Sequence, residues 1–286
     1  MRITIVGLGL LGGSMALALK KSAPAGSTIL GFSRREETLE KAKERGAVDA
    51  VARDLASAVK EADLVMIATP VLTSLKIIRE MSSSVREGCL VTDMGSTKLD
   101  VVKCAGESLP PGVDFIGGHP MAGKETSGID EADEDLFRGC VYCLCPLVGV
   151  RPASVEILEN KVRSVGARPL VMEPEKHDHL VASVSHLPML LSAALVSTTM
   201  GNPGWPDMAR LAAGGYRDVS RLASGNPEMN RDIFLTNRSE TIFWLDILIE
   251  KLQEYRRLVA GGADELTRAL SWARQAREGW MRGEER

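Results

Sequence analysis

The segment that most limits the fold lies at the start of the chain, where a short strand runs into a glycine-rich turn. Ile3–Val6 is an apolar, β-branched run, and a helical stretch follows the turn Gly7-Leu8-Gly9-Leu10-Leu11-Gly12. In a GxGxxG pattern the first glycine permits a tight turn, the second lets backbone approach a pyrophosphate, and the third lets the helix pack against the strand. This order predicts a dinucleotide-binding βαβ unit.

Strand and helix patterns then alternate to about residue 172. The predicted strands are Ile3–Val6, Thr28–Phe32, Leu64–Ile67, Cys89–Thr92, Phe115–Ile116, Val141–Cys145 and Pro169–Met172. The predicted helices are Gly12–Lys20, Glu36–Arg45, Leu72–Ser84, Lys98–Ala105 and Ala153–Ser164. Such alternation predicts an α/β fold, a doubly wound, Rossmann-like sheet with helices on both faces, over residues 1–173.

After Glu173-Pro174 the strand patterns stop, and apolar helical periods follow at 177–200, 207–222, 228–258 and 263–281. They predict an all-helical domain over residues 174–286. In the third period a wide apolar stripe includes Phe234, Ile242, Trp244 and Leu252. Either a partner subunit or packing inside an all-helical domain accounts for so wide a stripe.

Composition narrows the class of protein. The net charge is −3 and aromatic residues make up 4%, so we expect no nucleic-acid or anionic-membrane partner. Five cysteines and no leader segment predict a soluble, cytoplasmic protein with free thiols. Cys140, Cys143 and Cys145 lack a metal-site spacing, so no metal is expected. Val181–Met200 is uncharged but contains His186, Pro188 and several hydroxyl residues, which favours a buried helix over a membrane span.

The residues after each strand indicate the cofactor. An NAD site places Asp or Glu at the end of the second strand, but Thr28–Phe32 is followed by Ser33-Arg34-Arg35. A hydroxyl and two guanidiniums suit a 2′-phosphate, so we expect NADP, with NAD as an alternative. The other interpretation is that Arg34 and Arg35 are the solvated start of a helix. Ala68-Thr69-Pro70, after the strand Leu64–Ile67, is expected to line the same site.

Two further strand ends carry candidate catalytic groups. Ser96 lies in the turn Asp93–Lys98, where it could equally be a helix N-cap, as could Thr97. His119 lies among glycines in Gly117–Gly123, where small neighbours leave room for a substrate. Because ligands bind beyond the carboxyl ends of the strands in such folds, His119 is the candidate general base.

Six motifs occur in order: GLGLLGGS at 7–14, DMGSTK at 93–98, GGHPMAG at 117–123, HD at 177–178, SHLP at 185–188 and GGYRDVSR at 214–221. Together they resemble the prephenate/arogenate dehydrogenases of tyrosine biosynthesis. The resemblance implies a Rossmann domain, a helical domain that forms a homodimer, and oxidative decarboxylation of a cyclohexadienyl substrate. Hydride passes from the ring carbon bearing the 4-hydroxyl to the nicotinamide, CO2 departs, and the ring becomes aromatic.

The resemblance also implies roles for individual residues. His119 would take the proton of the 4-hydroxyl. Ser96 would bond the same hydroxyl and help hold His119, and Arg221 would bind the side-chain carboxylate as a bidentate fork. The remaining implied substrate-site residues are His186 and Gly214 lining the cleft, Glu125 at its mouth, and Asp218 orienting the segment of Arg221.

Two positions depart from the family pattern. Many prephenate-using members carry a second histidine after SHLP, where this chain has Met189. Arogenate dehydrogenases of the cyanobacterial type resemble it in having an apolar residue there and Ser-Arg after the second strand. The resemblance therefore favours L-arogenate, with an NAD-dependent prephenate dehydrogenase as the alternative. The second departure is Asn230, where relatives often carry tryptophan.

Two other classes of function remain open to the sequence alone. One is a different dehydrogenase with a Rossmann and a helical domain, such as a 3-hydroxyacid dehydrogenase or an imine reductase. The usual catalytic Lys or Asp of those enzymes lies in the helical domain, whereas the candidate histidine here follows a sheet strand. The other is an NADP-sensing protein, which would not need His119, Ser96 and Arg221 together.

Overall fold

The first compact unit of the computed structural model, Met1–Arg238, is built on one sheet; the structure describes residues 1–22, 26–124 and 126–283. Eight strands lie in the order β3-β2-β1-β4-β5-β6-β7-β8, and all neighbours are parallel except β6 and β7. The strands are β1 (Arg2–Val6), β2 (Thr28–Phe32), β3 (Ala50–Val51), β4 (Leu64–Ile67), β5 (Leu90–Asp93), β6 (Asp114–Pro120), β7 (Val141–Pro146) and β8 (Arg168–Val171). This confirms the predicted α/β fold.

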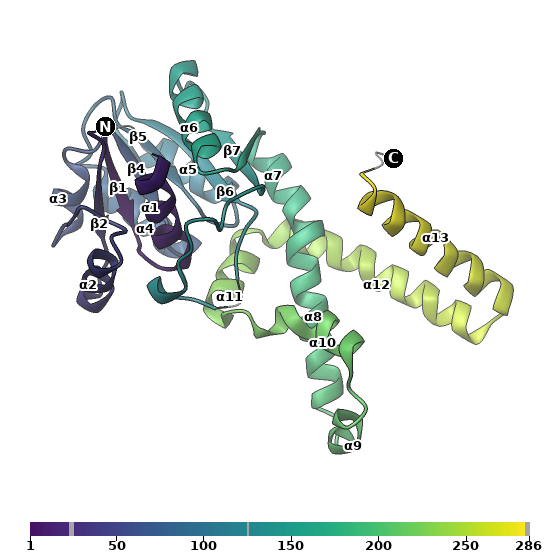
Figure 1. Cartoon of the computed structure of the whole chain (residues 1–286). Helices are drawn as coiled ribbons and strands as arrows, with labels where there is room; N and C mark the ends of the chain where they lie inside the picture. The colour runs from purple at the N-terminus through teal and green to yellow at the C-terminus, as the bar shows by residue number, and fades with distance from the viewer. Residues whose placement is uncertain (23–25, 125, 284–286) are drawn as a thin grey trace. The chain divides into compact units, whose positions relative to one another are not determined.

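Helices flank the sheet on both sides (Figure 1). They are α1 (Leu10–Ser22), α2 (Glu36–Glu44), α3 (Leu55–Val59), α4 (Val71–Met81), α5 (Leu99–Ser108) and α6 (Pro152–Ser164). Side chains of α1, α2 and α6 form one apolar cluster against the sheet, and side chains of α3, α4 and α5 form a second. Because β4 gives Leu64 and Met66 to the first cluster and Val65 and Ile67 to the second, its uninterrupted apolar sequence is explained.

All seven predicted strands form, and the deviations are local. The prediction missed β3 and α3, which are two and five residues long and too short for a periodic signal. His119 was expected after a strand ending at Ile116, but β6 continues to Pro120, so His119 lies inside the strand. Its continuation is stabilised by antiparallel pairing with β7, where His119 faces Cys143.

The rest of the first unit is helical. Its elements are α7 (Pro174–Val181), the π-helical turn η2 (Ala182–His186), α8 (Leu187–Met200), α9 (Trp205–Ala209), α10 (Gly214–Ser220), the 3₁₀ turn η3 (Arg221–Ser224) and α11 (Pro227–Thr236). In the π-helical turn the Leu187 N–H donates to the Ala182 carbonyl, five residues back. Pro188 follows and has no N–H to give, so the wider turn fits the chain locally.

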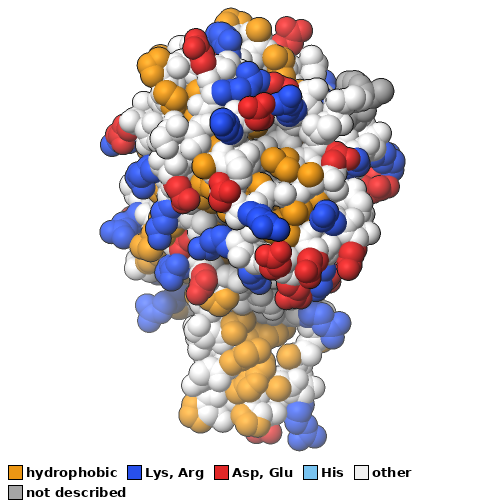
Figure 2. Space-filling model, turned by 90° about the vertical axis from the view of Figure 1, so that its left-hand side faces the viewer, with side chains coloured by type: hydrophobic (Ala, Val, Ile, Leu, Met, Phe, Trp, Pro, Cys, Tyr) orange, Lys and Arg blue, Asp and Glu red, His pale blue; other side chains and the backbone are white. Residues whose placement is uncertain are grey.

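The prediction of a buried helix over Val181–Met200 is wrong for the chain by itself. The continuous helix Pro174–Met200 could cross a membrane if only its length and composition are considered. Only 22% of its most apolar 18-residue segment is buried. Figure 2 shows hydrophobic side chains gathered at the lower end of the view, over α8 and the helices that follow it. Exposed apolar residues of this part include Leu191, Met200 and Leu211. The amino-terminal end of the helix Pro174–Met200, however, carries buried polar groups, among them His177 and Asp178.

The second unit, Ser239–Arg286, contains most of α12 (Arg238–Ala260) and α13 (Ala263–Met281). The predicted helical period 228–258 is divided at Asn237, which ends α11. Both helices of this unit expose large apolar residues, such as Ile242 and Leu252 on α12 and Trp272 on α13. The domain boundary near residue 173 stays a prediction.

The glycine-rich turn yields a test with a matched control. A Cβ on Gly12 would lie 1.8 Å from the Gly7 carbonyl oxygen, whereas a Cβ on Gly9 meets nothing within 4 Å. We therefore expect Gly12→Ala to lower the melting temperature. Gly9→Ala should keep the wild-type melting temperature but weaken dinucleotide binding at least tenfold, because its methyl occupies the space reserved for the pyrophosphate. Thermal unfolding and fluorescence titration with NADPH measure both; unchanged binding in Gly9→Ala contradicts this role.

Candidate active site

A cavity of about 750 Å³ opens beside the glycine-rich turn, at the point where the strand order reverses between β1 and β4. Most of the predicted cofactor residues line it: Gly7, Leu8, Gly9, Ser33, Arg34, Arg35, Ala68, Thr69 and Pro70. Leu10, Leu11 and Gly12 form the first turn of α1 instead. The structure thus brings together three strand ends that are far apart in sequence.

The turn has the shape that a dinucleotide requires. Gly7 has a φ of 97°, and a Cβ there would lie 2.6 Å from the Ala68 carbonyl oxygen. The open space at Gly9 lies at the amino end of α1, where unpaired N–H groups and the helix dipole favour a phosphate. These residues fit a nicotinamide dinucleotide, held through its pyrophosphate.

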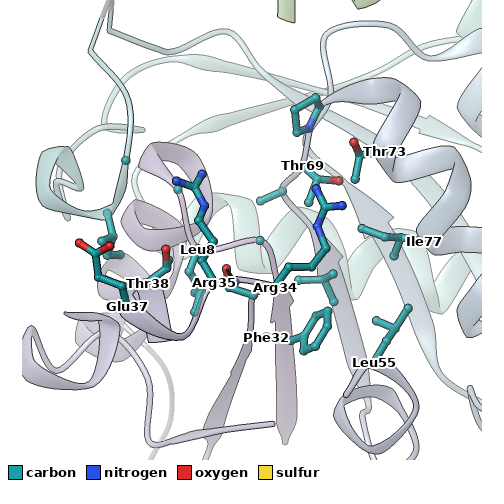
Figure 3. Close-up of a pocket in the computed structure, with 18 of the residues that line it drawn as sticks. Leu8, Phe32, Arg34, Arg35, Glu37, Thr38, Leu55, Thr69, Thr73 and Ile77 are labelled. Atoms are coloured by element: carbon teal, nitrogen blue, oxygen red, sulfur yellow. Dashed lines mark hydrogen bonds between the residues drawn. The ribbon is translucent and has the colours of Figure 1, made fainter. Parts of the chain in front are cut away.

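Figure 3 shows Arg34 and Arg35 rising from the end of β2 into the pocket, with Phe32, Leu55 and Ile77 as an apolar part of its wall. Within the described ranges neither guanidinium forms an ion pair. Glu37 also lines the pocket, but it pairs with Lys41 at 3.0 Å, and Lys41 pairs with Asp130 at 2.8 Å. The pocket therefore offers two uncompensated positive groups beside an apolar wall.

The second constellation centres on His119. Its Nδ1 lies 2.9 Å from Nε2 of His177, whose own Nδ1 lies 2.7 Å from Oδ1 of Asp178. Because the carboxylate only accepts, His177 carries its proton on Nδ1 and accepts at Nε2. His119 therefore donates from Nδ1 and keeps a lone pair on Nε2. The three residues form a chain of hydrogen bonds that fixes which nitrogen of His119 is basic.

His119 is buried, with 8% of its surface exposed. Burial lowers its pKa well below the usual 6.5, and electrostatic interactions with His177, Lys98 and His186 lower it further. The imidazole is therefore neutral at physiological pH and ready to accept a proton.

Asp178 links this chain to the start of α5. Its carboxylate accepts hydrogen bonds from the backbone N–H of Lys98 at 2.8 Å and of Leu99 at 2.9 Å. The alternative interpretation of this turn, in which Ser96 or Thr97 is a helix N-cap, is wrong, since the cap position is Lys98 and no side chain of the segment fills it. A carboxylate from α7 does so because Asp178 is buried beside these N–H groups.

The motif HD at 177–178 gave no indication in sequence of the roles of His177 and Asp178. His186 and Asn237 form the next part of the network. The Asn237 Nδ2 donates to the Asp178 carbonyl oxygen at 2.7 Å and to His186 Nδ1 at 3.2 Å. His186 must then carry its proton on Nε2, which is buried and has no hydrogen-bond partner in the described part of the chain. Burial lowers the pKa of His186 to about 4, so this ring is also neutral. A buried donor without a partner is a group that a polar ligand would satisfy.

The other predicted site residues lie as follows. Ser96 is half-buried in the turn after β5, and within the described residues no hydrogen bond joins it to His119. Arg221 begins η3 and is exposed, and its segment is held to α8 by a hydrogen bond from Ala223 N–H to Ser192 Oγ at 2.9 Å. Gly214 and Asp218 are exposed on α10, and Glu125 lies outside the described residues. The roles of these five residues stay predictions.

Comparison with protein families matches the chain in two parts. Residues 15–171 match the family described as prephenate dehydrogenase, nucleotide-binding domain, and residues 173–272 match prephenate dehydrogenase, dimerization domain. The chain belongs to the prephenate dehydrogenase family.

Individual relatives agree with this assignment. Prephenate dehydrogenase of Bacillus subtilis is 39% identical over 97% of this chain and 75% of its own length. The crystal structure of Synechocystis arogenate dehydrogenase is 32% identical, with a TM-score of 0.83 over 98% of this chain and 100% of that one. The Aquifex aeolicus prephenate dehydrogenase in complex with hydroxyphenyl propionate and NAD⁺ is 31% identical, with a TM-score of 0.90 over 97% of each chain.

Family membership and the shape of the glycine-rich turn agree. The chain is an NAD(P)-dependent oxidoreductase of the prephenate/arogenate dehydrogenase family, and its cofactor is a nicotinamide dinucleotide. This sets aside both the 3-hydroxyacid dehydrogenase or imine reductase and the NADP-sensing protein.

Proposed function

We propose that this enzyme converts L-arogenate with NADP by oxidative decarboxylation in tyrosine biosynthesis, with NAD-dependent turnover of prephenate as the second candidate. The observation that carries the proposed chemistry is the basic Nε2 of His119, fixed by His177 and Asp178 near the carboxyl edge of a dinucleotide-binding sheet. Steady-state kinetics with both substrates and both cofactors tests the proposal; an enzyme inactive on both substrates overturns it.

In the proposed reaction the His119 Nε2 accepts the proton of the substrate 4-hydroxyl as the carbonyl develops. His177 and Asp178 keep the tautomer and stabilise the imidazolium as the proton arrives, as a carboxylate does behind a catalytic histidine. The nicotinamide, when bound, supplies the acceptor for the hydride of the same carbon. Departure of CO2 sends its bonding electron pair through the ring to the carbonyl oxygen, and the resulting phenolate becomes a phenol when His119 returns the proton.

The remaining roles concern binding. Ser96 would bond the same hydroxyl, and Arg221 would bind the side-chain carboxylate. The Nε2–H of His186 lacks a partner and would donate to an oxygen of the substrate. Gly214 and Glu125 would line the cleft, and Asp218 would orient the segment of Arg221.

We also propose that the enzyme is a soluble, cytoplasmic homodimer formed through its helical part. The matched dimerization family and the exposed apolar residues of α8, α12 and α13 support this assembly. A second subunit would cover side chains such as Leu191, Ile242 and Trp272, which face solvent in one chain.

The role of His119 has a kinetic and a pH signature. His119→Ala should lower kcat about 10²- to 10⁴-fold, the usual contribution of general acid–base catalysis, while NADP binding stays unchanged. Only neutral His119 accepts a proton, so kcat/KM falls as pH drops through its pKa. Because burial lowers that pKa, the acid limb of kcat/KM should lie below pH 6.5 in the wild type. A variant that keeps more than a tenth of kcat when chemistry limits turnover contradicts the role.

NADP is favoured by the end of β2. Ser33, Arg34 and Arg35 line the pocket, and the sequence has no carboxylate at the strand end to repel a 2′-phosphate. Glu37, which lines the pocket close to this strand end, pairs with Lys41. A guanidinium binds phosphate oxygens well, and a charge-assisted hydrogen bond contributes about 1.5–3 kcal/mol.

We therefore expect NADP to exceed NAD in kcat/KM. Arg34→Ala should remove about 1.5–3 kcal/mol of that preference, about tenfold or more, because it deletes a bond to the 2′-phosphate alone. Activity with NAD should change much less and serves as the internal control. A wild-type enzyme that prefers NAD contradicts this assignment.

L-arogenate is favoured by the residue after SHLP. The two substrates share the ring, the 4-hydroxyl and both carboxylates, so contacts from His119, Ser96 and Arg221 do not discriminate. They differ where arogenate has an ammonium group and prephenate a keto oxygen. Met189, half-buried on α8, offers neither a donor to a keto oxygen nor a positive charge to repel an ammonium. Glu125, if it reaches the cleft, would favour the ammonium.

Met189→His should therefore raise the ratio of kcat/KM for prephenate to that for arogenate, by about 1–3 kcal/mol at most, the worth of one such contact. Met189→Leu keeps the apolar character and should leave the ratio unchanged. Competition assays with both substrates measure the ratio directly. A higher kcat/KM on prephenate in the wild type contradicts the choice of substrate but not the reaction.

A further inference from the structure

A buried ion pair at the end of β5 has no part in the proposed chemistry. Lys98 Nζ contacts the Asp93 carboxylate, and both side chains are completely shielded from solvent. Burial of two charges carries a desolvation cost that their attraction often fails to recover, so such a pair is weak evidence for stability. Its hydrogen-bond partners indicate another role.

The ion pair binds the backbone just before His119. Lys98 Nζ donates to the Gly118 carbonyl at 2.7 Å, and the Gly118 N–H donates to Asp93 Oδ1 at 3.1 Å. The ladder between β5 and β6 ends earlier, at Thr92 and Ile116. The two charged side chains therefore link β6 to the end of β5 beyond the last backbone pair of their ladder.

The same pair fixes both ends of the turn that carries Ser96. Asp93 Oδ2 accepts from the Gly95 N–H at 2.7 Å, and Lys98 lies at the other end, where its own N–H donates to Asp178. The approach is close, since a Cβ on Gly118 would lie 2.4 Å from the Asp93 carbonyl oxygen. Neither end of the turn is thus free to shift relative to β6.

We propose that the Lys98–Asp93 ion pair fixes the position of His119 on β6 relative to the turn after β5 that carries Ser96. It acts as a positioning device because it holds the two segments whose side chains the substrate hydroxyl would meet. The inference rests on the proposed function, which places His119 and Ser96 on that hydroxyl. Misplacement of a catalytic group by about 1 Å costs on the order of 10²-fold in rate.

The charges around His119 provide a readout beyond folding. The titratable groups described around the ion pair and the imidazole are Asp178, His177, His186, Tyr142, Cys143 and Cys145. Lys98 is one of the groups that lower the pKa of His119. Loss of its ammonium should therefore move the acid limb of kcat/KM upward, toward 6.5, which a loss of folding stability alone does not do.

Two variants separate positioning from stability. Lys98→Met leaves Asp93 unpaired, so it should lower the melting temperature, reduce kcat about 10- to 100-fold and change KM much less. Asp93→Asn/Lys98→Met removes both charges and should recover most of the melting temperature lost in Lys98→Met, because it leaves no unpaired charge buried. It should not recover kcat or the acid limb. NADP affinity, measured by fluorescence titration, should stay at the wild-type value in both.

The control is a charged pair at the start of β6, the strand that carries His119 near its other end. Arg151 Nε donates to Asp114 at 2.7 Å, at the start of β6 and away from His119. Arg151→Met should lower the melting temperature without changing kcat or the pH profile.

The double variant decides the outcome even if Lys98→Met does not fold. Wild-type kcat together with a wild-type acid limb in the double variant overturns the proposal and leaves the pair a structural one. Failure of the proposed function looks different: the wild type is then inactive on both substrates, or His119→Asn keeps its activity whatever the ion-pair variants do.

Discussion

The site depends on one carboxylate, that of Asp178. It accepts two backbone N–H groups at the start of α5 and the Nδ1–H of His177, so a single side chain joins a Rossmann helix to the hydrogen-bond chain behind His119. It thereby gives the first N–H groups of α5 the hydrogen-bond partners that a helix cannot supply itself. The tautomer of His119 and the placement of α7 on the sheet therefore have a common cause.

The features that were predictable from sequence are local ones. The GxGxxG turn requires glycines because a Cβ on Gly12 would meet the backbone of Gly7, and a Cβ on Gly7 would meet the backbone of Ala68, directly after β4. A strand and a helix flank the turn directly, so the whole pattern is visible in a short stretch of sequence. The strands of the sheet were predictable because burial on both faces gives continuous apolar runs. His119 stood out through its glycine neighbours, although its strand runs further than the apolar pattern suggested.

The features that were missed join residues far apart in sequence. His119 and His177 are 58 residues apart, and Lys98 and Asp178 are 80 apart. A single sequence carries no signal for such pairings. The Lys98–Asp93 pair is close in sequence, but a charged residue at a strand end and another at a helix start look the same as an ordinary solvated turn. Only burial, which depends on β6 and α7, distinguishes the two.

The two histidines of the network have opposite functions at the same atom. His119 donates from Nδ1 to His177, so its Nε2 is an acceptor; His186 accepts at Nδ1 from Asn237, so its Nε2 is a donor. Asp178 determines both tautomers. Its carboxylate orients His177, which contacts His119, and its backbone carbonyl orients the Asn237 amide, which contacts His186. Burial keeps both rings neutral. The protein therefore presents one acceptor, at Nε2 of His119, and one donor, at Nε2 of His186, and neither ring adds a charge.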